Sequence, residues 1–298
     1  MQTLITDIQR FSLSDGPGIR TTVFFKGCNM RCTWCHNPET LSLSKELMHY
    51  PDKCIGCMRC VSVCPVGAHK IENGVHTLDR RLCKSCGKCA SLCYAEALVL
   101  SGKEMTVSEI MDEVRRDKAY YDASGGGVTL SGGEVLCHLD FALALAKACR
   151  KEGISVAIET NLSFPFEKIE PLLKETDVVM ADLKLFDDDT HQKYTGVSNK
   201  KTRENIARIN AIPIIVRTPL IPGVTATREN LRAIAKSLVG KKNLVYYQLL
   251  NFNPLGASKY DGIGKKNPFL EERPYSEAEM AEFEDFLSDI PVKIKVGE

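Results

Sequence analysis

The sequence predicts an α/β fold: a partial barrel of six strands with crossover helices, interrupted by an inserted cysteine-rich domain. Two observations support this prediction. Short apolar strands alternate with longer amphipathic stretches over most of the chain, and residues 51–97 depart from that pattern with a cysteine repeat of their own. Alternating strands and helices are typical of a parallel sheet, whose strands are apolar because helices cover both faces. A chain of 298 residues, 44% hydrophobic, can bury the core that such a barrel needs.

The expected strands are short runs of apolar and β-branched residues, and they lie at 21–25, 128–131, 155–159, 178–183, 214–219 and 244–250. The expected helices have apolar residues at intervals of three and four, and they lie at 106–116, 139–151, 202–210, 227–238 and 276–287. Ser108 and Thr227 are expected to cap two of these helices. The barrel should therefore consist of residues 1–50 and 98–298.

Composition and charge point to a cytoplasmic protein. The formal net charge is +1, so no overall field favours nucleic acid or an anionic membrane. The N-terminus lacks the basic and then apolar segments of a secretion signal, and no apolar stretch approaches the length of about eighteen residues that spans a bilayer. We expect neither nucleic acid nor membrane as a partner.

Cys28, Cys32 and Cys35 directly follow the first expected strand, at the end of the barrel where active sites lie. Three thiolates are one fewer than a structural zinc ion or an electron-transfer cluster uses. If these three held a [4Fe–4S] cluster, its fourth iron would keep an open position for a small molecule with nitrogen and oxygen donors. The alternative is a zinc site completed by His36, although adjacent residues rarely both reach one ion with tetrahedral geometry.

Residues 54–64 and 83–93 both read C-x2-C-x2-C-x3-C, which makes an internal repeat. Clustered spacing of this kind favours metal or cluster binding over disulfides. Both runs resemble the motifs of bacterial two-cluster ferredoxins, with Tyr94 in place of the usual proline. In those ferredoxins the fourth cysteine of each run ligates the other cluster. The resemblance therefore implies one [4Fe–4S] cluster on Cys54, Cys57, Cys60 and Cys93 and a second on Cys64, Cys83, Cys86 and Cys89.

Several further motifs accompany the C-x3-C-x2-C loop: DGPGIRTTVFFKGC, WCHNPE, SGGE, ETN, DLK and HQKYTGVSN. In this combination and order they resemble the glycyl radical enzyme activating enzymes of the radical S-adenosylmethionine superfamily, in the larger subtype with a two-cluster ferredoxin-like insert. The resemblance implies a partial (β/α)6 barrel of the TIM type, interrupted by this insert at residues 51–97. It also implies three [4Fe–4S] clusters, with S-adenosylmethionine as the fourth ligand of the barrel cluster.

The activity that this resemblance implies is reductive cleavage of S-adenosylmethionine to a 5′-deoxyadenosyl radical. The radical would abstract hydrogen from a glycine of a partner glycyl radical enzyme, with electrons from a flavodoxin or ferredoxin-type donor. The insert clusters would relay or store electrons, although a structural role or zinc in their place is the alternative. Two other functions stay open: a radical S-adenosylmethionine enzyme acting on a small molecule, and an iron–sulfur electron-transfer protein.

The resemblance also implies roles for individual residues. Cofactor contacts are expected at Trp34, Cys35, His36, Gly132, Gly133, Asp182, Leu183, Lys184, Arg217 and Asn253, the last in place of a histidine common in the family. A monovalent cation site is expected at Glu159, Thr160, Met180 and Asp182, and contacts with the substrate peptide at Asp15 and Arg20. Without that context Trp34 is equally a core residue, Asp15 a turn residue, and Asp182 with Lys184 a surface ion pair.

Overall fold

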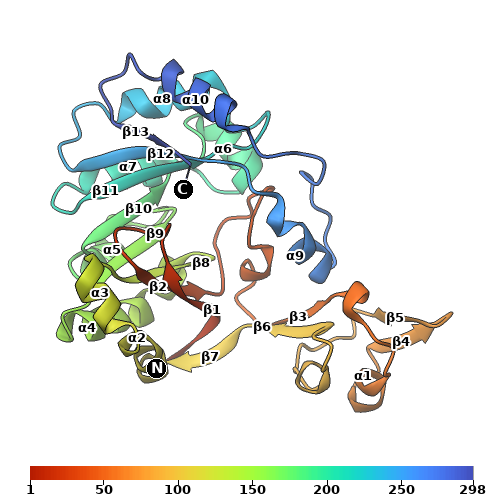
Figure 1. The fold of residues 1–298 in the computed structure, drawn as a ribbon. Coiled ribbons are helices and arrows are strands. Elements are labelled where there is room, and N and C mark those ends of the chain that lie inside the picture. The colour runs from red at the N-terminus through yellow and green to blue at the C-terminus, as the bar shows by residue number, and fades with distance from the viewer. Residues whose placement is uncertain (298) are drawn as a thin grey trace.

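A computed structural model describes residues 1–297 (Figure 1). Its centre is a nine-stranded sheet in the order β13-β12-β11-β10-β9-β8-β2-β1-β7. The strands from β13 to β2 in this order run parallel, and β1 and β7 add an antiparallel edge. The bounds are β1 Gln2–Ser12, β2 Arg20–Phe25, β7 Lys103–Thr106, β8 Gly127–Gly132, β9 Ser155–Thr160, β10 Val178–Asp182, β11 Ile214–Pro219, β12 Leu244–Leu250 and β13 Ile294–Val296.

All six expected strands form, as β2 and β8 to β12. Three strands of this sheet were not expected. β1 alternates between buried and exposed residues over its first half, and β7 and β13 are only four and three residues long. None of the three has the continuous apolar run by which the other strands were recognised. β7 and β13 are the short edges of the sheet, and the antiparallel β1 is not buried on both faces.

The helices pack mainly on the outside of the sheet (Figure 1). Their bounds are α2 Val107–Arg115, α3 Lys118–Ser124, α4 Leu139–Lys151, α5 Phe166–Leu173, α6 Asp188–Thr195, α7 Lys200–Arg208, α8 Arg228–Ser237, α9 Ala257–Gly262 and α10 Glu277–Phe286. Thr227 caps α8, as expected. The expectation for Ser108 was wrong: Thr106 is the cap of α2, because its extended backbone lets its hydroxyl accept a bond from the Glu109 amide.

The hydrophobic core lies between the sheet and these helices. Val128, Ile158 and Val216 from three strands are fully buried there together with Leu145 from α4. A smaller apolar group, Ala157, Met180 and Ile215, lies apart from it. The parallel strands are thus buried on both faces, which fits their near-continuous apolar sequences.

Residues 51–97 form a lobe that Figure 1 shows beside the sheet; we call it the cysteine lobe. It is connected through β3 (Glu46–His49) and β6 (Leu98–Ser101), which pair antiparallel. It contains α1 (Arg59–Val63) and a hairpin of β4 (His69–Glu72) and β5 (Val75–Leu78). Among the described residues, no helix has the length and apolar character needed to cross a membrane.

Candidate active site

The loop that carries Cys28, Cys32 and Cys35 begins where β2 ends. Its root is closed by backbone bonds, in which Gly27 N donates to Thr40 O over 2.6 Å and Cys28 N to Leu41 O over 3.3 Å. Burial raises the pKa of the Cys35 thiol to about 12 and also raises that of Cys28. These thiols would therefore stay protonated unless a metal centre bound them as thiolates.

Gly132 and Gly133, at the end of β8, pack against the root of this loop. Gly133 N donates to Phe25 O over 2.8 Å, and Glu134 N donates to Gly27 O over 2.9 Å. A Cβ atom added to Gly133 would lie 2.4 Å from Gly27 O. Gly132 has a φ of +113°, and an added Cβ would lie 2.3 Å from the Phe25 backbone. Only glycine fits at either position, so the SGGE motif sets the position of the cysteine loop.

The far side of the loop is held by the end of α6. Arg31 N donates to Thr195 O over 2.7 Å, and Thr33 N donates to Tyr194 O over 3.0 Å. Asn199 is fully buried, and its amide donates to the carbonyl of Leu185 over 2.7 Å. The HQKYTGVSN motif thus fixes the cysteine loop through its backbone rather than by reaching the thiols.

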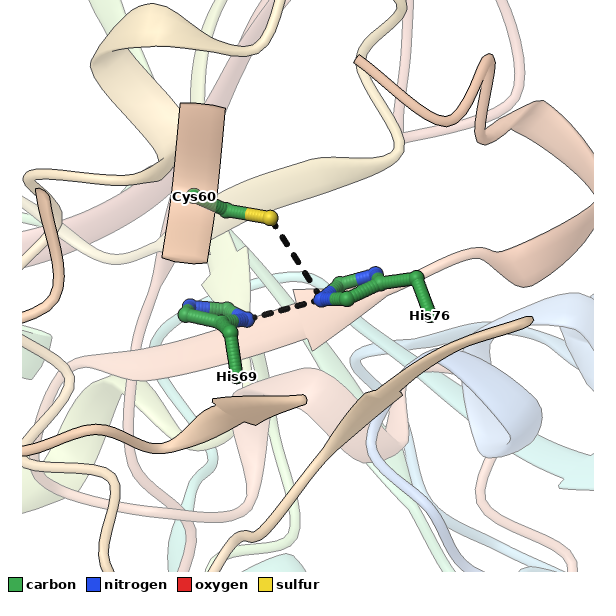
Figure 2. A group of neighbouring side chains, drawn as sticks. All are labelled: Cys60, His69 and His76. Atoms are coloured by element: carbon green, nitrogen blue, oxygen red, sulfur yellow. Dashed lines mark hydrogen bonds between the residues drawn. The ribbon is translucent and has the colours of Figure 1, made fainter. Parts of the chain in front are cut away.

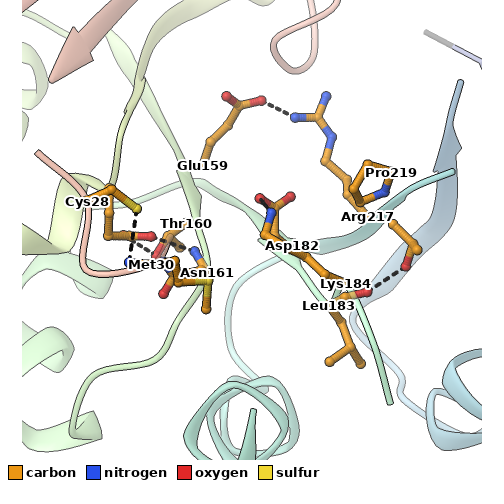
Figure 3. Close-up of polar contacts among 12 residues, drawn as sticks. Cys28, Met30, Glu159, Thr160, Asn161, Asp182, Leu183, Lys184, Arg217 and Pro219 are labelled. Carbon is orange, nitrogen blue, oxygen red and sulfur yellow. Dashed lines mark hydrogen bonds and ion pairs between the residues drawn. The ribbon is translucent and has the colours of Figure 1, made fainter. Parts of the chain in front are cut away.

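Charged side chains gather at the ends of β9, β10 and β11. Glu159 and Arg217 form an ion pair, and Asp182 lies opposite Arg217 in the strand register (Figure 3). Lys184 Nζ is 2.7 Å from Asp182 Oδ2. Burial lowers the pKa of Lys184, but Asp182 and Cys32 outweigh that effect and the pKa is raised overall. Lys184 is therefore a charged group close to the cysteine loop.

A cavity of about 120 Å³ in the cysteine lobe is lined by Cys54, Cys57 and Cys60 of the first run together with Cys89 and Cys93 of the second. Two of the remaining cysteines accept bonds from backbone amides elsewhere in the lobe. Cys64 Sγ accepts a bond from Ala68 N over 3.2 Å, and Cys83 Sγ accepts one from Ser85 N over 3.4 Å. The two runs are thus interleaved in space, with Cys93 beside the first three cysteines.

The spacing of the thiols suits clusters better than single ions. Within residues 1–297 the one group of three ligand atoms lying within 4.8 Å of one another is Cys60, His69 and His76. Three sulfurs on one zinc ion, each at about 2.3 Å from the metal, would lie closer together than this limit. Neither the barrel thiols nor the all-cysteine sets of the lobe meet it, whereas an iron–sulfur cluster holds each thiolate on a different iron.

Comparison with known proteins places this geometry in a family. Residues 22–236 match the family described as the Radical SAM superfamily. The chain is 41% identical over 274 residues to the isethionate sulfite-lyase activating enzyme of Oleidesulfovibrio alaskensis, covering 89% of this chain and 88% of that protein. It is 37% identical over 303 residues to the trans-4-hydroxy-L-proline dehydratase activating enzyme of Clostridioides difficile, covering 100% of both.

The chain belongs to the radical SAM superfamily, among the activating enzymes of glycyl radical enzymes. Membership implies a [4Fe–4S] cluster and S-adenosylmethionine. A solved structure of a radical SAM methyltransferase from Sphaerobacter thermophilus has the same fold, with a TM-score of 0.54 and 14% identity over 99% of this chain and 77% of that one. That likeness concerns the fold alone.

The four residues expected to bind a cation lie on the neighbouring strands β9 and β10, where Met180 is opposite Glu159 in the register. Glu159 pairs with Arg217, whereas the Thr160 hydroxyl donates to Glu134 over 2.6 Å. Successive residues of a strand point to opposite faces, which separates these two side chains. Met180 lies in the small apolar group. Asp182 is thus the one expected cation ligand whose carboxylate shares the rim with Glu159 (Figure 3).

Trp34, His36 and Asn253 lie on the side of the loop that faces the C-terminal segment. Trp34 is buried in an apolar group with Phe252. His36 is exposed, and its backbone packs closely on Gly256. Asn253 is also exposed, and its side chain accepts a bond from Leu255 N over 2.9 Å.

Asp15 and Arg20 are both engaged within the chain. Arg20 is only 1% exposed, and its guanidinium donates to Thr129 Oγ1 over 2.7 Å and to Val128 O over 2.6 Å. Asp15 accepts a bond from the Thr22 hydroxyl over 2.7 Å. Both residues therefore shape the loop before β2.

Glu134 is a site residue that the sequence analysis did not single out, although it ends the SGGE motif. It is 2% exposed and accepts bonds from Leu136 N over 3.0 Å and Asn161 N over 2.7 Å. Burial raises its pKa to about 7. It links the ends of β8 and β9 directly behind the cysteine loop.

Helix α9 connects the cysteine lobe to the cysteine loop, a connection that no sequence pattern predicted. On the lobe side, Arg80 donates to Gly262 O over 2.5 Å and to Leu47 O over 2.9 Å. On the loop side, Tyr260 donates to Thr33 O over 3.3 Å. Lys259 Nζ lies 3.1 Å from Glu39 Oε1. One short helix thus contacts both cysteine-bearing regions.

Proposed function

We propose that Cys28, Cys32 and Cys35 hold a [4Fe–4S] cluster whose open iron binds S-adenosylmethionine. With one electron from a donor, the bound pair would supply a 5′-deoxyadenosyl radical and release methionine, and the radical would take a hydrogen atom from a glycine of a partner glycyl radical enzyme. The observation that carries this proposal is the arrangement of three thiols on one loop at the carboxyl end of β2, in a chain that matches the radical SAM superfamily.

The chain's own residues would bind and orient the methionine end of the cofactor. Lys184 and Arg217 are cations at the rim, and each is aligned by a carboxylate, Asp182 or Glu159. Either cation can pair with the methionine carboxylate. Gly132 and Gly133 hold the root of the cysteine loop, so their backbone would lie beside the methionine end of the cofactor. The exposed Asn253 can donate or accept a hydrogen bond on the side of the loop where Trp34 and His36 lie.

We further propose that residues 51–97 are a ferredoxin-like domain with two [4Fe–4S] clusters. Cys54, Cys57, Cys60 and Cys93 would hold one and Cys64, Cys83, Cys86 and Cys89 the other. The shared cavity brings Cys93 beside the first three cysteines, as the first set requires, and Cys89 of the second set also lines it. With four thiolates each, neither cluster would have an open iron, so their role is to pass electrons from a flavodoxin or ferredoxin-type donor to the barrel. Exposed, unpaired thiols fit the reducing cytoplasm.

The test is to supply the reconstituted protein with S-adenosylmethionine, dithionite and a candidate glycyl radical enzyme. The partner is labelled with α-deuterated glycine. We expect a glycyl radical by electron paramagnetic resonance and deuterium in the 5′-deoxyadenosine. Deuterium-free 5′-deoxyadenosine with no protein radical would contradict the proposal and favour a small-molecule substrate instead.

A further inference from the structure

Three of the six histidines of the chain gather beside Cys60 in the cysteine lobe. His49, His69 and His76 come from β3, β4 and β5 and are 8%, 4% and 7% exposed. His76 Nε2 lies 2.9 Å from His69 Nδ1 and 3.5 Å from Cys60 Sγ (Figure 2). The His49 ring packs edge-on against His76 with centroids 4.5 Å apart. The group is thus a buried stack of imidazoles that ends at a sulfur.

The histidines break the symmetry of the internal repeat. Cys60 is the third cysteine of the first run, and its equivalent in the second run is Cys89. The remaining three histidines of the chain lie in the barrel: His36 in the cysteine loop, His138 on the Lys26 carbonyl and His191 on the Val197 carbonyl. An imidazole next to a sulfur is therefore a property of one run only.

The surroundings of His76 select the tautomer with the proton on Nε2. Cys60 Sγ and His69 Nδ1 both lie on the Nε2 side, 3.5 Å and 2.9 Å away, so a proton on Nε2 is shared between them and His69 Nδ1 acts as an acceptor. Nδ1 is buried without a partner, and a proton there would be an unsatisfied donor, which is rarer in proteins than an unsatisfied acceptor.

A cluster-bound Cys60 is a thiolate and can only accept a hydrogen bond. We propose that His76 donates a hydrogen bond from Nε2 to Cys60 and raises the reduction potential of the cluster held by Cys54, Cys57, Cys60 and Cys93. A hydrogen bond to a cluster sulfur stabilises the reduced state, which carries more negative charge. This inference rests on the proposed function of the lobe. It makes His76 a positioning residue that favours storage of the electron on this cluster.

The test is a potentiometric titration of the full-length reconstituted protein, followed by electron paramagnetic resonance. His76→Phe keeps a ring of similar shape and removes the donor. We expect it to shift the ratio of reduced to oxidised cluster about tenfold at a fixed potential, which equals 59 mV downward for a one-electron couple. His76→Gln keeps an amide donor and should recover part of the shift. The potentials of the other clusters should stay unchanged.

His49→Phe is the matched control, because it removes a neighbouring imidazole and leaves the contact between His76 and Cys60. We expect less than a twofold change in the same ratio. An equal shift in both phenylalanine variants would assign the effect to packing and overturn the proposal. A second measurement needs no variant: in protein labelled with 15N-histidine, the reduced cluster should show a 15N coupling, and its absence would overturn the proposal.

The iron content separates this inference from the proposed function. About twelve irons with no shift in His76→Phe would overturn the role of His76 and leave the three-cluster proposal intact. About four irons, with zinc bound through Cys60, His69 and His76, would overturn both, since those three atoms lie close enough together for one ion.

Discussion

The barrel loop and the cysteine lobe place cysteines at similar spacing in very different surroundings. The barrel loop is enclosed by β2, β8 and α6, and its neighbour Gly133 has no room for even a methyl group. In the lobe, Gly56 between Cys54 and Cys57 has no atom near its added Cβ, and Ile55 and Tyr94 are 72% and 81% exposed. The barrel thus positions three thiols tightly, whereas the lobe surrounds its thiols loosely.

In this protein, the loop with three thiols has tightly packed neighbours, whereas the lobe with two runs of four thiols has loosely packed ones. A site that leaves one iron open must orient a cofactor, and precise orientation requires locked neighbours. A cluster with four thiolates needs only to be held and reached by electrons. The two regions can therefore be separated by experiments that disturb one and leave the other intact.

The largest effect should come from Cys28→Ala, which removes a ligand of the barrel cluster. We expect 5′-deoxyadenosine formation to fall by about a thousandfold or more, because a transition-state group is lost entirely. The iron content should fall from about twelve to about eight while the lobe keeps its clusters. Cys149→Ala, a buried cysteine of α4, is the control. Cleavage at the wild-type rate in Cys28→Ala would make the lobe the functional centre.

The next effect is expected from Cys57→Ala in the lobe. About four irons should be lost, and the rate with a flavodoxin-type donor should fall about tenfold. The rate with dithionite should hold, because a small reductant can reach the barrel cluster directly. If dithionite-driven cleavage disappears in Cys57→Ala as completely as in Cys28→Ala, the two regions are not functionally separable.

A smaller effect is expected from paired glycine substitutions measured by denaturant unfolding. Gly133→Ala forces a Cβ to within 2.4 Å of Gly27 O and should cost about 3 kcal/mol by overpacking. The added Cβ of Gly56→Ala would have no other atom within 4 Å. The residue has a φ of +68°, however, so the substitution should cost about 1 kcal/mol by backbone strain. Equal costs would show that the loop is no more tightly held than the lobe.

The smallest expected effect is a loss of stability at acid pH. Burial lowers the pKa of His49 from 6.5 to about 4. The folded protein therefore binds fewer protons than the unfolded chain in this window, and stability that is complete above pH 6.5 is lost as the pH falls through about 4. In His49→Phe, the drop in the free energy of unfolding between pH 7 and pH 4 should be about 1 to 2 kcal/mol smaller than in the wild type. Hydrogen exchange should locate the loss in the lobe; protection lost first around Cys28 would contradict this.

The sequence was informative where one short stretch carried the signal. The six parallel strands were recognised from continuous apolar runs, and the cysteine loop from its spacing after β2. The histidine group was not recognised, because His49, His69 and His76 meet only after β3 pairs with β6 and the β4–β5 hairpin folds back. Glu134 was overlooked because its role depends on Asn161, a neighbour on another strand. Such contacts between distant segments have no local pattern.

Helix α9 has a consequence for protein engineering. Arg80 of the lobe uses the carbonyl of Gly262 as an acceptor, and Tyr50 lies 2.9 Å from the position where Gly262 would carry a Cβ. The lobe therefore depends on contacts with residues outside 51–97. A chimaera that grafts residues 51–97 onto another barrel must also carry residues 257–264, since otherwise the transplanted lobe would lose the contacts that fix its position.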